Sequence, residues 1–390
     1  MKIAIVVQRY GRDVVGGSET FARLLSEHLS KYFKVDVLTT CAKDHTTWRN
    51  VYQPGVEIFN GVTVRRFKND TMRSQNFSEL HGRLLFSKNS TTILDEFEFQ
   101  KLQGPYSTDL LNYIKTRKNE YDIFIFVTYL FFTSFFGLLT VPEKSILIPT
   151  AHNEGTIYFD IFKAIFRSPK GIIFLSEEEK KLVHSLFKNE HIPHRVIGIG
   201  IEFVDGNEDV FRKLYNLNFP FIVYAGRIEE AKGILKLIEF FARYKDEYPS
   251  NLKLILIGQK SIHVPNHKDI IYLGMFAESD RLNAIKSAEI LVQPSLYESF
   301  SLVLLEAWSQ KIPVLVNGNS DVLRGHVVRS NGGLYYSSYL EFAECMNLLL
   351  SDLQLRNKLG ENGYKYVKQN YSWVKIEQQY VDFVKTMGGR

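Results

Sequence analysis

Residues 295–308 read Ser295-Leu-Tyr-Glu298-Ser-Phe-Ser-Leu-Val-Leu-Leu-Glu306-Ala-Trp308, a segment with two glutamates eight positions apart. Pro294 opens a loop before Glu298, and the apolar run from Leu302 onward predicts a buried helix that starts near Ser301. Glu298 would then lie beside free backbone N–H groups at the start of that helix, where anions bind readily. A site for a nucleotide-activated sugar requires backbone amides that bind its phosphates and carboxylates that bind its hydroxyl groups.

This segment resembles the E-x7-E motif of retaining glycosyltransferases with the two-domain GT-B fold, most closely glycosyltransferase family 4 of the group 1 type. The family form is close to P-S-x-x-E-G-F-G-L-x-x-x-E-A, and serines stand in place of both glycines. The resemblance implies an α/β GT-B fold with two Rossmann-like domains facing each other across a cleft. It implies that Glu298 binds the sugar hydroxyls and Glu306 the ribose hydroxyls. The donor-binding residues expected in this segment are Glu298, Ser299, Phe300, Ser301, Leu302 and Glu306.

The composition is that of an ordinary globular protein, and 390 residues suit two to three domains. Subtracting Asp and Glu from Lys and Arg gives 26 − 21 = +5 for residues 1–200 and 22 − 22 = 0 beyond them. A basic first half suits an anionic membrane surface, a lipid-phosphate acceptor or an acidic glycan, although a generic basic surface explains it equally well. No dense Lys/Arg run occurs, so nucleic-acid binding is not expected.

The two cysteines, Cys41 and Cys345, have no His or Cys at metal-ligand spacing, so neither a disulfide framework nor a zinc site is indicated. A cytoplasmic protein is the expectation, with peripheral association at the inner membrane face left open by the basic half. The uncharged stretch Ile123–Val141 is long enough for a membrane helix. Its β-rich start and the polar residues that follow favour a buried strand and then a short helix at Phe131–Leu139.

Strand-like runs alternate with amphipathic helical runs, which predicts parallel sheets covered on both sides. The first series of strands is expected at Lys2–Val7, Val35–Thr39, Val62–Phe67, Ile123–Val127, Ser145–Ile148 and Gly171–Leu175. The second series is expected at Phe221–Ala225, Leu252–Ile257, Ile270–Leu273, Glu289–Gln293 and Pro313–Val316. In the family the last helix packs back on the first domain. We therefore expect an acceptor-side domain of residues 1–203 with the C-terminal helix 370–390, and a nucleotide-sugar-binding domain of residues 204–369.

The pair Gly16-Gly17 follows the first expected strand and precedes an amphipathic helix. Adjacent glycines let the backbone approach a ligand closely and present N–H groups to phosphate, although a plain turn before a helix capped by Ser18 or Thr20 is the structural alternative. In family 4 the matching loop lies against the donor phosphates. The resemblance therefore assigns Gly16 and Gly17 to donor binding.

Arg227 and Lys232 stand in Ala225-Gly-Arg227-Ile-Glu-Glu-Ala-Lys232-Gly233, which resembles the G-R-x4-K-G loop of the family. The resemblance implies that both cations hold the donor diphosphate, whose charge grows in the transition state as the glycosidic bond breaks. No Asp-x-Asp pair occurs, so we expect no metal ion and no cofactor besides the nucleotide-sugar co-substrate. Met275 and Phe276 match the position of nucleobase contacts in the family, unless Phe276 belongs to the core.

The segment Pro149-Thr-Ala-His152-Asn-Glu154-Gly ends a strand, and the carboxyl ends of parallel strands are where ligands bind in such sheets. His152 matches the histidine that lies by the donor sugar in the family, where it would bind the sugar and stabilise charge without acting as a base. Glu154 either orients His152 or is a charge at a helix start. The expected catalytic residues are His152, Glu298, Arg227 and Lys232.

The sequence thus predicts a retaining, metal-independent hexosyltransferase of polysaccharide or glycoconjugate biosynthesis. It would move a sugar from a nucleotide-sugar donor, UDP-sugar favoured over GDP-sugar, to a glycan or lipid-linked acceptor. Two alternatives stay open, namely a nucleotide-sugar 2-epimerase of GT-B fold and a non-catalytic GT-B subunit that binds glycan. The first-domain segments His45–Pro54 and Asp70–Ser90 are the expected acceptor loops, but no pattern in them identifies the acceptor.

Overall fold

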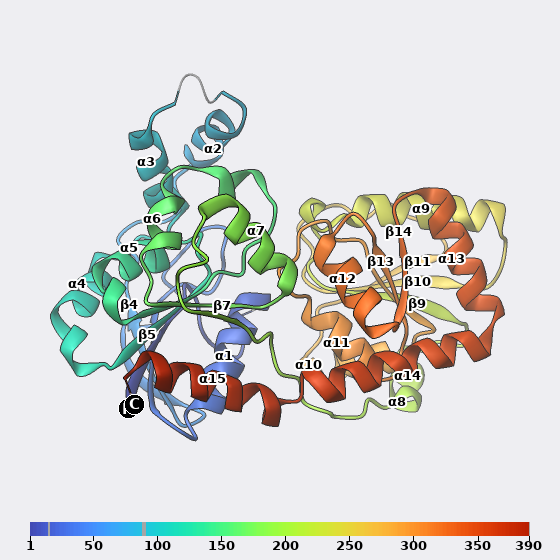
Figure 1. Ribbon diagram of the computed structural model, residues 1–390. Helices are drawn as coiled ribbons and strands as arrows, with labels where there is room; N and C mark the ends of the chain where they lie inside the picture. The colour runs from blue at the N-terminus through green and yellow to red at the C-terminus, as the bar shows by residue number, and fades with distance from the viewer. Residues whose placement is uncertain (15, 88–90, 390) are drawn as a thin grey trace. The chain divides into compact units, whose positions relative to one another are not determined.

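The computed structural model describes residues 1–14, 16–87 and 91–389, and it divides into two compact units (Figure 1). Unit 1 comprises Met1–Ile199 and Ile376–Arg390, and unit 2 comprises Gly200–Lys375. The chain passes from unit 1 to unit 2 between residues 199 and 200, four residues before the boundary expected from the sequence. It returns between residues 375 and 376, six residues after the expected boundary. Each unit contains its own Rossmann-like parallel sheet, so the expected α/β architecture is confirmed.

Unit 1 is built on an eight-stranded sheet in the order β3-β4-β2-β1-β5-β6-β7-β8, and all neighbours are parallel except β3 and β4. The strands are β1 (Lys2–Val6), β2 (Lys34–Thr40), β3 (Gly55–Phe59), β4 (Val62–Phe67), β5 (Ile123–Val127), β6 (Ser145–Ile148), β7 (Gly171–Phe174) and β8 (His194–Val196). The central strands β5, β6 and β7 are buried along their whole length, as parallel strands covered on both faces are. The parallel strands end along one side of the sheet, which we call its carboxyl edge.

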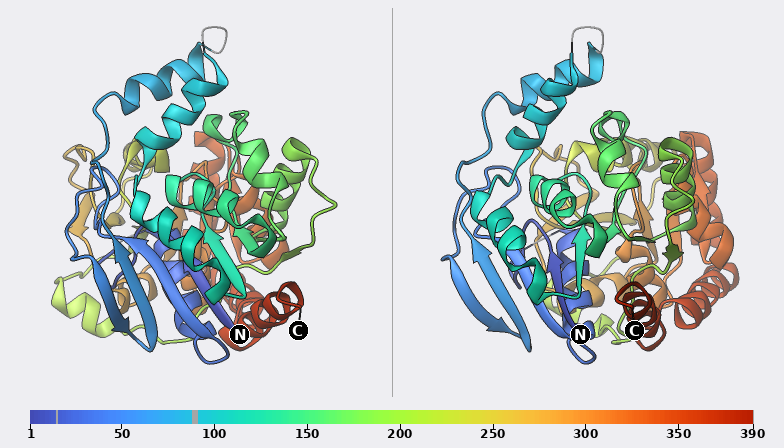
Figure 2. Two further views of the ribbon diagram at one scale, coloured as in Figure 1. Left: turned by 90° about the vertical axis from the view of Figure 1, so that its left-hand side faces the viewer. Right: turned by 60° about the vertical axis from the view of Figure 1, so that its left-hand side comes forward.

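The helices of this unit are α1 (Gly17–Leu29), α2 (Phe77–Phe86), α3 (Ile93–Gln103), α4 (Thr108–Arg117), α5 (Phe132–Thr140), α6 (Phe162–Arg167), α7 (Glu177–Phe187) and most of α15 (Trp373–Met387). Helices α2 and α3 run side by side in the views of Figures 1 and 2. The stretch expected to form a buried strand and a short helix is β5 followed by α5, so that interpretation is confirmed. No helix within the described ranges combines the length and hydrophobicity needed to cross a membrane.

The last helix is fixed to unit 1 by hydrogen bonds to one carboxylate. Glu377 on α15 accepts hydrogen bonds from Lys31 Nζ at 3.1 Å and from Tyr32 Oη at 2.9 Å, and His28 Nδ1 lies 2.7 Å away. Although burial opposes ionisation, these partners hold the pKa of Glu377 below its ordinary value. The return of the last helix to the first unit is what the resemblance implied.

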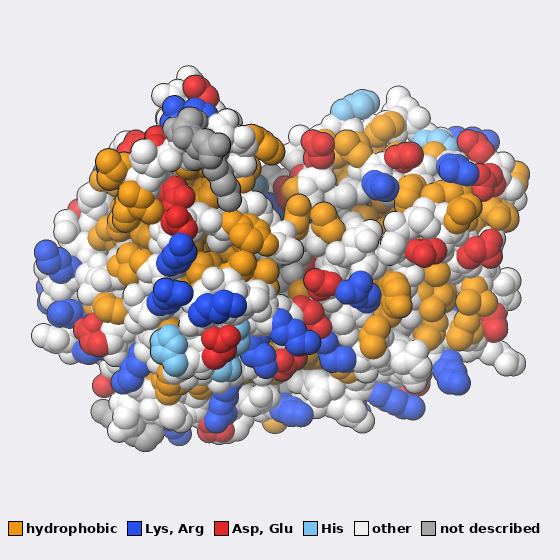
Figure 3. Space-filling model, turned by 45° about the horizontal axis from the view of Figure 1, so that its top comes forward, with side chains coloured by type: hydrophobic (Ala, Val, Ile, Leu, Met, Phe, Trp, Pro, Cys, Tyr) orange, Lys and Arg blue, Asp and Glu red, His pale blue; other side chains and the backbone are white. Residues whose placement is uncertain are grey.

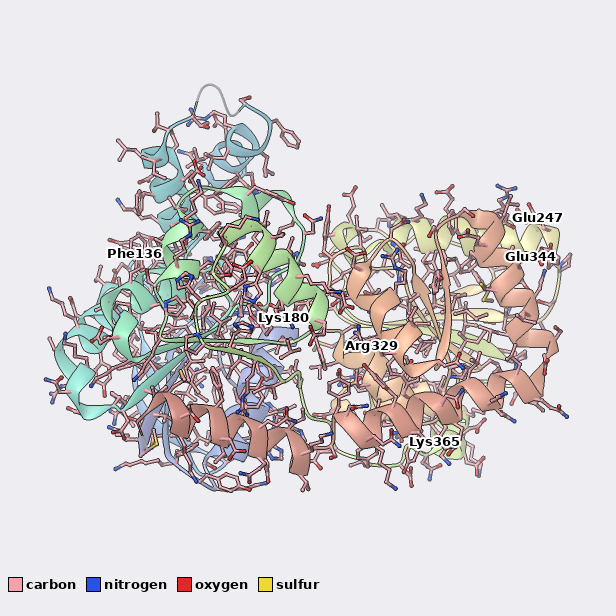
Figure 4. The ribbon with its side chains drawn as sticks, viewed as in Figure 1. Phe136, Lys180, Glu247, Arg329, Glu344 and Lys365 are labelled. Atoms are coloured by element: carbon pink, nitrogen blue, oxygen red, sulfur yellow. The ribbon has the colours of Figure 1, made fainter. Side chains whose placement is uncertain are left out.

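Unit 2 has a six-stranded, wholly parallel sheet in the order β11-β10-β9-β12-β13-β14. The strands are β9 (Phe221–Ala225), β10 (Lys253–Ile257), β11 (Ile270–Gly274), β12 (Ile290–Gln293), β13 (Val314–Asn317) and β14 (Gly333–Tyr336). The helices are α8 (Glu208–Leu214), α9 (Ile234–Glu247), α10 (Glu278–Lys286), α11 (Leu302–Ser309), α12 (Asp321–Ser330), α13 (Tyr339–Ser351) and α14 (Leu353–Asn370). Glu247 at the end of α9 accepts a hydrogen bond from Tyr339 Oη of α13 at 2.6 Å. Glu247 and Glu344 lie on the same side of the unit (Figure 4).

The strand order of each sheet reverses direction at one point. In unit 1 this point lies between β1 and β5, and in unit 2 it lies between β9 and β12. Loops that leave the carboxyl edge on either side of such a point diverge and leave a crevice, where ligands of doubly wound sheets bind. On the face shown in Figure 3, Lys and Arg side chains are interspersed with Asp and Glu side chains.

Candidate active site

The loops after β9 and β12 meet at the carboxyl edge of unit 2. The two strands are parallel neighbours, so both loops begin at the strand-order reversal. Gly233 has φ 72°, and a Cβ at this residue would lie 2.6 Å from the carbonyl oxygen of Pro294. Only glycine combines that backbone conformation with so close an approach. Gly233, the second glycine of the G-R-x4-K-G pattern, therefore lets the loop of Arg227 and Lys232 pack against the loop that leads to Glu298.

Lys232 and Glu298 form an ion pair between these loops. Lys232 Nζ lies 2.8 Å from Glu298 Oε1, and the side chains keep 21% and 13% of their exposure. Arg227 is 36% exposed and pairs with Glu229 at 3.1 Å. Three of the four expected catalytic residues thus lie on two adjoining loops of unit 2. The cation and the first glutamate of the E-x7-E segment are in direct contact.

Glu306, the second glutamate, lies inside α11 and is held by an arginine that the sequence reasoning did not identify. Arg281 of α10 donates from Nε to Glu306 Oε2 at 2.9 Å and from Nη2 to Oε1 at 2.5 Å. The charge of Glu306 raises the pKa of Arg281, although burial opposes this. A bidentate pair of this kind fixes the carboxylate in one orientation.

The four residues Ser299, Phe300, Ser301 and Leu302 lead into α11. Ser301 precedes its first turn and has φ 76°, so it occupies the left-handed region in which glycine is favoured. The Phe300 side chain is 1% exposed and packs on the rings of His326 and Tyr371. Phe300 therefore offers a ligand its backbone rather than its ring.

Replacement of Ser301 by glycine should increase the free energy of unfolding. A side chain in the left-handed region costs about 1–2 kcal/mol, and the greater flexibility of unfolded glycine returns about 0.5–1 kcal/mol of that. We expect a net gain of about 0.5–1 kcal/mol in chemical denaturation. Ser299→Gly is the matched control, because Ser299 has no positive φ, and it should lose stability. Equal losses in both variants would contradict this account of Ser301.

Met275 and Phe276, which follow β11, differ in their surroundings. Met275 is 60% exposed, whereas Phe276 packs on the rings of Phe211 and Tyr215 at centroid distances of 5.9 and 5.3 Å. Phe276 thus takes part in an aromatic cluster with α8 and the residue that ends it. Met275 is therefore exposed enough to contact a nucleobase.

In unit 1, Gly16 immediately precedes α1 and Gly17 is the first residue of that helix, after the loop that follows β1. A Cβ at Gly16 would lie 2.1 Å from Glu19 Oε2, whereas a Cβ at Gly17 would meet nothing within 4 Å. Gly16 is therefore required by packing, and Gly17 is open toward solvent. The expected cap from Ser18 or Thr20 is wrong, because Gly16 is the N-cap and no side chain caps the helix.

The buried carboxylate beside Gly16 is a further residue that sequence reasoning missed. Glu19 Oε1 accepts hydrogen bonds from Arg9 Nε at 2.9 Å and from Gln8 Nε2 at 2.8 Å. Although burial opposes ionisation, Arg9 and hydrogen bonds from Ser18 and Gln8 hold the pKa of Glu19 below its ordinary value. This pair anchors the start of α1 to the end of β1. The glycine loop is thereby held at the carboxyl edge.

His152 follows β6 at the same edge of the unit 1 sheet. Its Nδ1 lies 3.7 Å from Glu154 Oε1, and that oxygen accepts a hydrogen bond from Tyr129 Oη at 3.3 Å. The threonines Thr128 and Thr150, which flank this region, have φ of 72° and 52°. β-Branched residues rarely adopt positive φ, and such strain tends to gather at functional sites. The arrangement fits a role of Glu154 in orienting His152.

Glu179, at the start of α7, holds the ends of β6 and β7 together. Its Oε1 accepts a hydrogen bond from Ala151 N, and its Oε2 accepts one from Leu175 N, both at 2.6 Å. Ala151 immediately precedes His152. Burial raises the pKa of Glu179 to about 8, although the backbone hydrogen bonds act in the opposite direction.

Glu179 should make the free energy of unfolding depend on pH. Between pH 4.5 and about 8 the folded state binds a proton at Glu179 that the unfolded state does not, so stability should fall as pH rises through this range. The slope is at most about 1.4 kcal/mol per pH unit. Denaturation at several pH values should show a flatter profile for Glu179→Gln, whereas the exposed neighbour Glu177→Gln serves as control. The same slope in Glu179→Gln and the parent would contradict the assignment.

The structure thus brings the predicted residues together in two sets. Arg227, Lys232 and Glu298 lie on adjoining loops of unit 2, and Glu306 lies about one turn into α11. Gly17 and His152 share the carboxyl edge of the unit 1 sheet. Within the parts of the chain that the structure describes, no group of three or more His, Cys, Asp or Glu residues is arranged to hold a metal ion.

Residues 206–366 match the family model described as glycosyl transferases group 1. This segment belongs to the group 1 glycosyltransferases. It comprises most of unit 2, including the loops that carry Arg227, Lys232 and Glu298, so the resemblance of these motifs to the group 1 glycosyltransferases is confirmed. The match agrees with the geometry, since the family segment contains the strand-order reversal at which those loops meet.

Longer alignments also match glycosyltransferases. The chain is 29% identical over 267 residues to the capsular polysaccharide biosynthesis glycosyltransferase CapM of Staphylococcus aureus. This alignment covers 61% of this chain and 69% of CapM. It is 26% identical to an uncharacterized glycosyltransferase of Methanocaldococcus jannaschii over 99% of this chain and 98% of that protein. The second alignment extends the similarity to glycosyltransferases through unit 1.

Solved structures agree on the fold. Sucrose-phosphate synthase of Thermosynechococcus elongatus superposes with a TM-score of 0.73 and 20% identity, over 99% of this chain and 98% of that one. HepE of Anabaena, solved with UDP-glucose, gives a TM-score of 0.73 at 16% identity, over 99% and 100% of the two chains. WaaG, a glycosyltransferase involved in lipopolysaccharide biosynthesis, gives 0.69 at 14% identity over the whole of both chains. The fold is therefore that of the GT-B glycosyltransferases.

Proposed function

We propose that this glycosyltransferase moves a hexosyl group from a nucleotide-sugar donor to a glycan or lipid-linked acceptor, with retention of anomeric configuration and without a metal ion. The observation that carries the proposal is the contact of Lys232 with Glu298 beside Arg227, at the strand-order reversal of unit 2. Two cations there can neutralise a departing diphosphate, and a carboxylate can hold sugar hydroxyls.

Each group then has one task in the reaction. The bond between the anomeric carbon and the diphosphate oxygen breaks, and a bond from the acceptor oxygen forms on the same face. The acceptor proton passes to the departing diphosphate oxygen, so no carboxylate nucleophile is needed. Arg227 and Lys232 stabilise the charge that grows on the diphosphate, and His152 hydrogen-bonds the sugar.

A UDP-sugar is the favoured donor. HepE, which has the same fold, was solved with UDP-glucose, and this supports a UDP-sugar as the donor. CapM, whose name places it in capsular polysaccharide biosynthesis, supports a role in the synthesis of a polysaccharide or glycoconjugate.

Calorimetric titration with UDP-, GDP- and ADP-sugars tests the proposal most directly. We expect UDP-sugars to bind most tightly and the product linkage, followed by NMR, to keep the anomeric configuration of the donor. A changed sugar formed without acceptor would favour the epimerase. Failure of every nucleotide sugar to bind would favour a non-catalytic subunit.

Activity should survive excess EDTA. The proposed mechanism uses Arg227 and Lys232 where a metal-dependent transferase uses a cation, so chelation should leave initial rates within about twofold of the untreated enzyme. Initial rates measured before and after dialysis against EDTA test whether transfer needs a metal ion. Complete loss that manganese or magnesium restores would contradict charge neutralisation by protein groups alone.

A further inference from the structure

Two unit 1 segments without a recognisable sequence pattern, the loops after β2 and β4, are joined by hydrogen bonds. Asn69 N donates to Asn50 Oδ1 and Asn50 Nδ2 donates to Asn69 O, both at 2.9 Å. Asn69 Nδ2 donates to Trp48 O, and Arg73 N donates to Thr47 O, each at 2.8 Å. Because β2 and β4 are parallel, the joined loops lie at the same carboxyl edge as the loop of His152.

Arg73 projects its guanidinium between two aromatic rings in this region. The group lies 5.3 Å from the ring centre of Trp48 and 4.5 Å from that of Phe77. Its hydrogen bonds are long, since Nη2 lies 3.2 Å from Gln103 O and 3.3 Å from Gln103 Oε1. Trp48 is itself fixed, because its Nε1 donates to Gln103 O at 2.6 Å and its side chain is 1% exposed. The arginine is thus held by a rigid frame.

Among the residues that the structure describes, this cation has no carboxylate paired with it. No carboxylate of the described residues lies within 4.0 Å of Arg73, and its buried Nε has no hydrogen-bond partner. Burial lowers the pKa of Arg73 to about 10, with Asp44 acting in the opposite direction. Asp44 is occupied elsewhere, since its Oδ1 accepts hydrogen bonds from the backbone N–H groups of Thr46 and Thr47. A partly buried charge without an acid is costly, which points to a partner that the described residues do not supply.

A second polar side chain near this frame also lacks partners. Gln100 lies one turn before Gln103 on α3, is fully buried, and has no hydrogen bond to either side-chain amide atom. The ring of His81 also stacks on that of Phe77 at a centroid distance of 5.5 Å, and His81 Nε2 lies 2.9 Å from Thr156 Oγ1. Thr156 follows His152 by four residues. Contacts therefore run from Arg73 to the segment that carries the proposed catalytic histidine.

We infer that Arg73 binds an oxyanion of the acceptor, a phosphate or a carboxylate, at the carboxyl edge of unit 1. The planar fork of arginine matches both groups in a bidentate manner, and Nη1 has no hydrogen-bond partner among the described residues. The ring contacts and Gln103 keep the fork in place before the anion arrives. The inference rests on the proposed function, which makes unit 1 the acceptor side, and it assigns an acidic acceptor.

The test follows the Nε–H signal of Arg73 by NMR in the full-length protein, assigned by its loss in Arg73→Gln. Inorganic phosphate and glucuronate are the two anionic probes, and glucose is the neutral one. We expect a saturable shift in the millimolar range with at least one anion and none with glucose. The probe that saturates at lower concentration distinguishes phosphate from carboxylate. No shift with either anion, or an equal shift with glucose, would overturn the inference.

Affinity in the variants is measured through the Trp48 indole N–H signal, which every variant retains. Arg73→Gln should weaken anion binding about ten- to a hundredfold, and Arg73→Lys, which keeps the charge without the fork, should fall in between. Arg83→Gln removes the same charge from the surface of α2, where Arg83 pairs with Asp95, and should bind like the parent. Equal affinity in the parent and Arg73→Gln would contradict the assignment.

Nucleotide-sugar binding measured on the same samples separates this inference from the proposed function and confirms that the variants are folded. If nucleotide sugars bind and Arg73 does not respond to anions, the acidic acceptor is wrong and the transferase stands. If Arg73 responds and no nucleotide sugar binds, the anion site stands and the transferase is wrong.

Discussion

Lys232→Ala is expected to lower kcat/KM for the donor about ten- to a hundredfold while the protein stays folded. The loss corresponds to one charge-assisted contact, worth about 1.5–3 kcal/mol. The contact to the diphosphate strengthens as the bond breaks, so kcat should fall together with kcat/KM. Lys232 is partly exposed on a loop, and its removal leaves only the partly exposed Glu298 without its cation. Initial rates across a donor titration, with thermal unfolding measured in parallel, give both quantities.

Lys236→Ala is the matched control for this change. Lys236 lies in the first turn of α9, carries the same charge and contacts the ring of Phe240 instead of a motif residue. Arg227→Ala should resemble Lys232→Ala, because the proposed mechanism assigns both cations to the same diphosphate. Unchanged turnover in both Arg227→Ala and Lys232→Ala would remove the assignment of the diphosphate to this loop.

Most of the fold could be predicted because its strands are continuous apolar runs between polar turns. The central strands β5 and β9 were expected with the bounds that the structure gives them. The short edge strand β3 was missed because its residues are largely exposed and carry no apolar run. The Asn60-Gly61 turn, with φ of 47° and 80°, is the signal that could have found it, since this pair favours a tight hairpin.

The site was predictable where spacing within one segment carries the chemistry, and less so where the fold brings distant residues together. Arg281 could not be found from its neighbours in the sequence, because its partner Glu306 is 25 residues away and on another helix. Gly16 was assigned to donor binding from its place before a helix and from the resemblance to the glycine-rich loop of the family, whereas the structure shows that the buried Glu19 carboxylate leaves no room for a side chain there. The family form has glycine where this chain has Ser301. The positive φ at that position explains the glycine, and a linear pattern does not reveal it.

The two glutamates should differ in what their removal costs. Glu306→Ala should weaken binding of free UDP as well as of the intact donor, because a carboxylate that holds ribose hydroxyls is used by both. A loss of about tenfold or more is expected in calorimetry. Arg281 would lose the carboxylate that binds both ends of its fork, so part of the effect can come through local structure. Glu306→Gln keeps one acceptor oxygen for Arg281, and Glu361→Ala removes a surface carboxylate of the same unit as control.

Glu298→Ala should spare the affinity for free UDP and damage transfer, because the proposed contacts of Glu298 are made to the moving sugar. Its loss also frees Lys232, which can then approach the diphosphate without a competing carboxylate, so UDP affinity should stay equal or rise slightly. The readout is the calorimetric affinity for UDP beside the initial rate of transfer for each variant. If Glu298→Ala loses UDP affinity and Glu306→Ala keeps it, the two roles are reversed. If neither variant changes binding or transfer, the ion pairs of Glu298 and Glu306 serve the stability of unit 2 and not its chemistry.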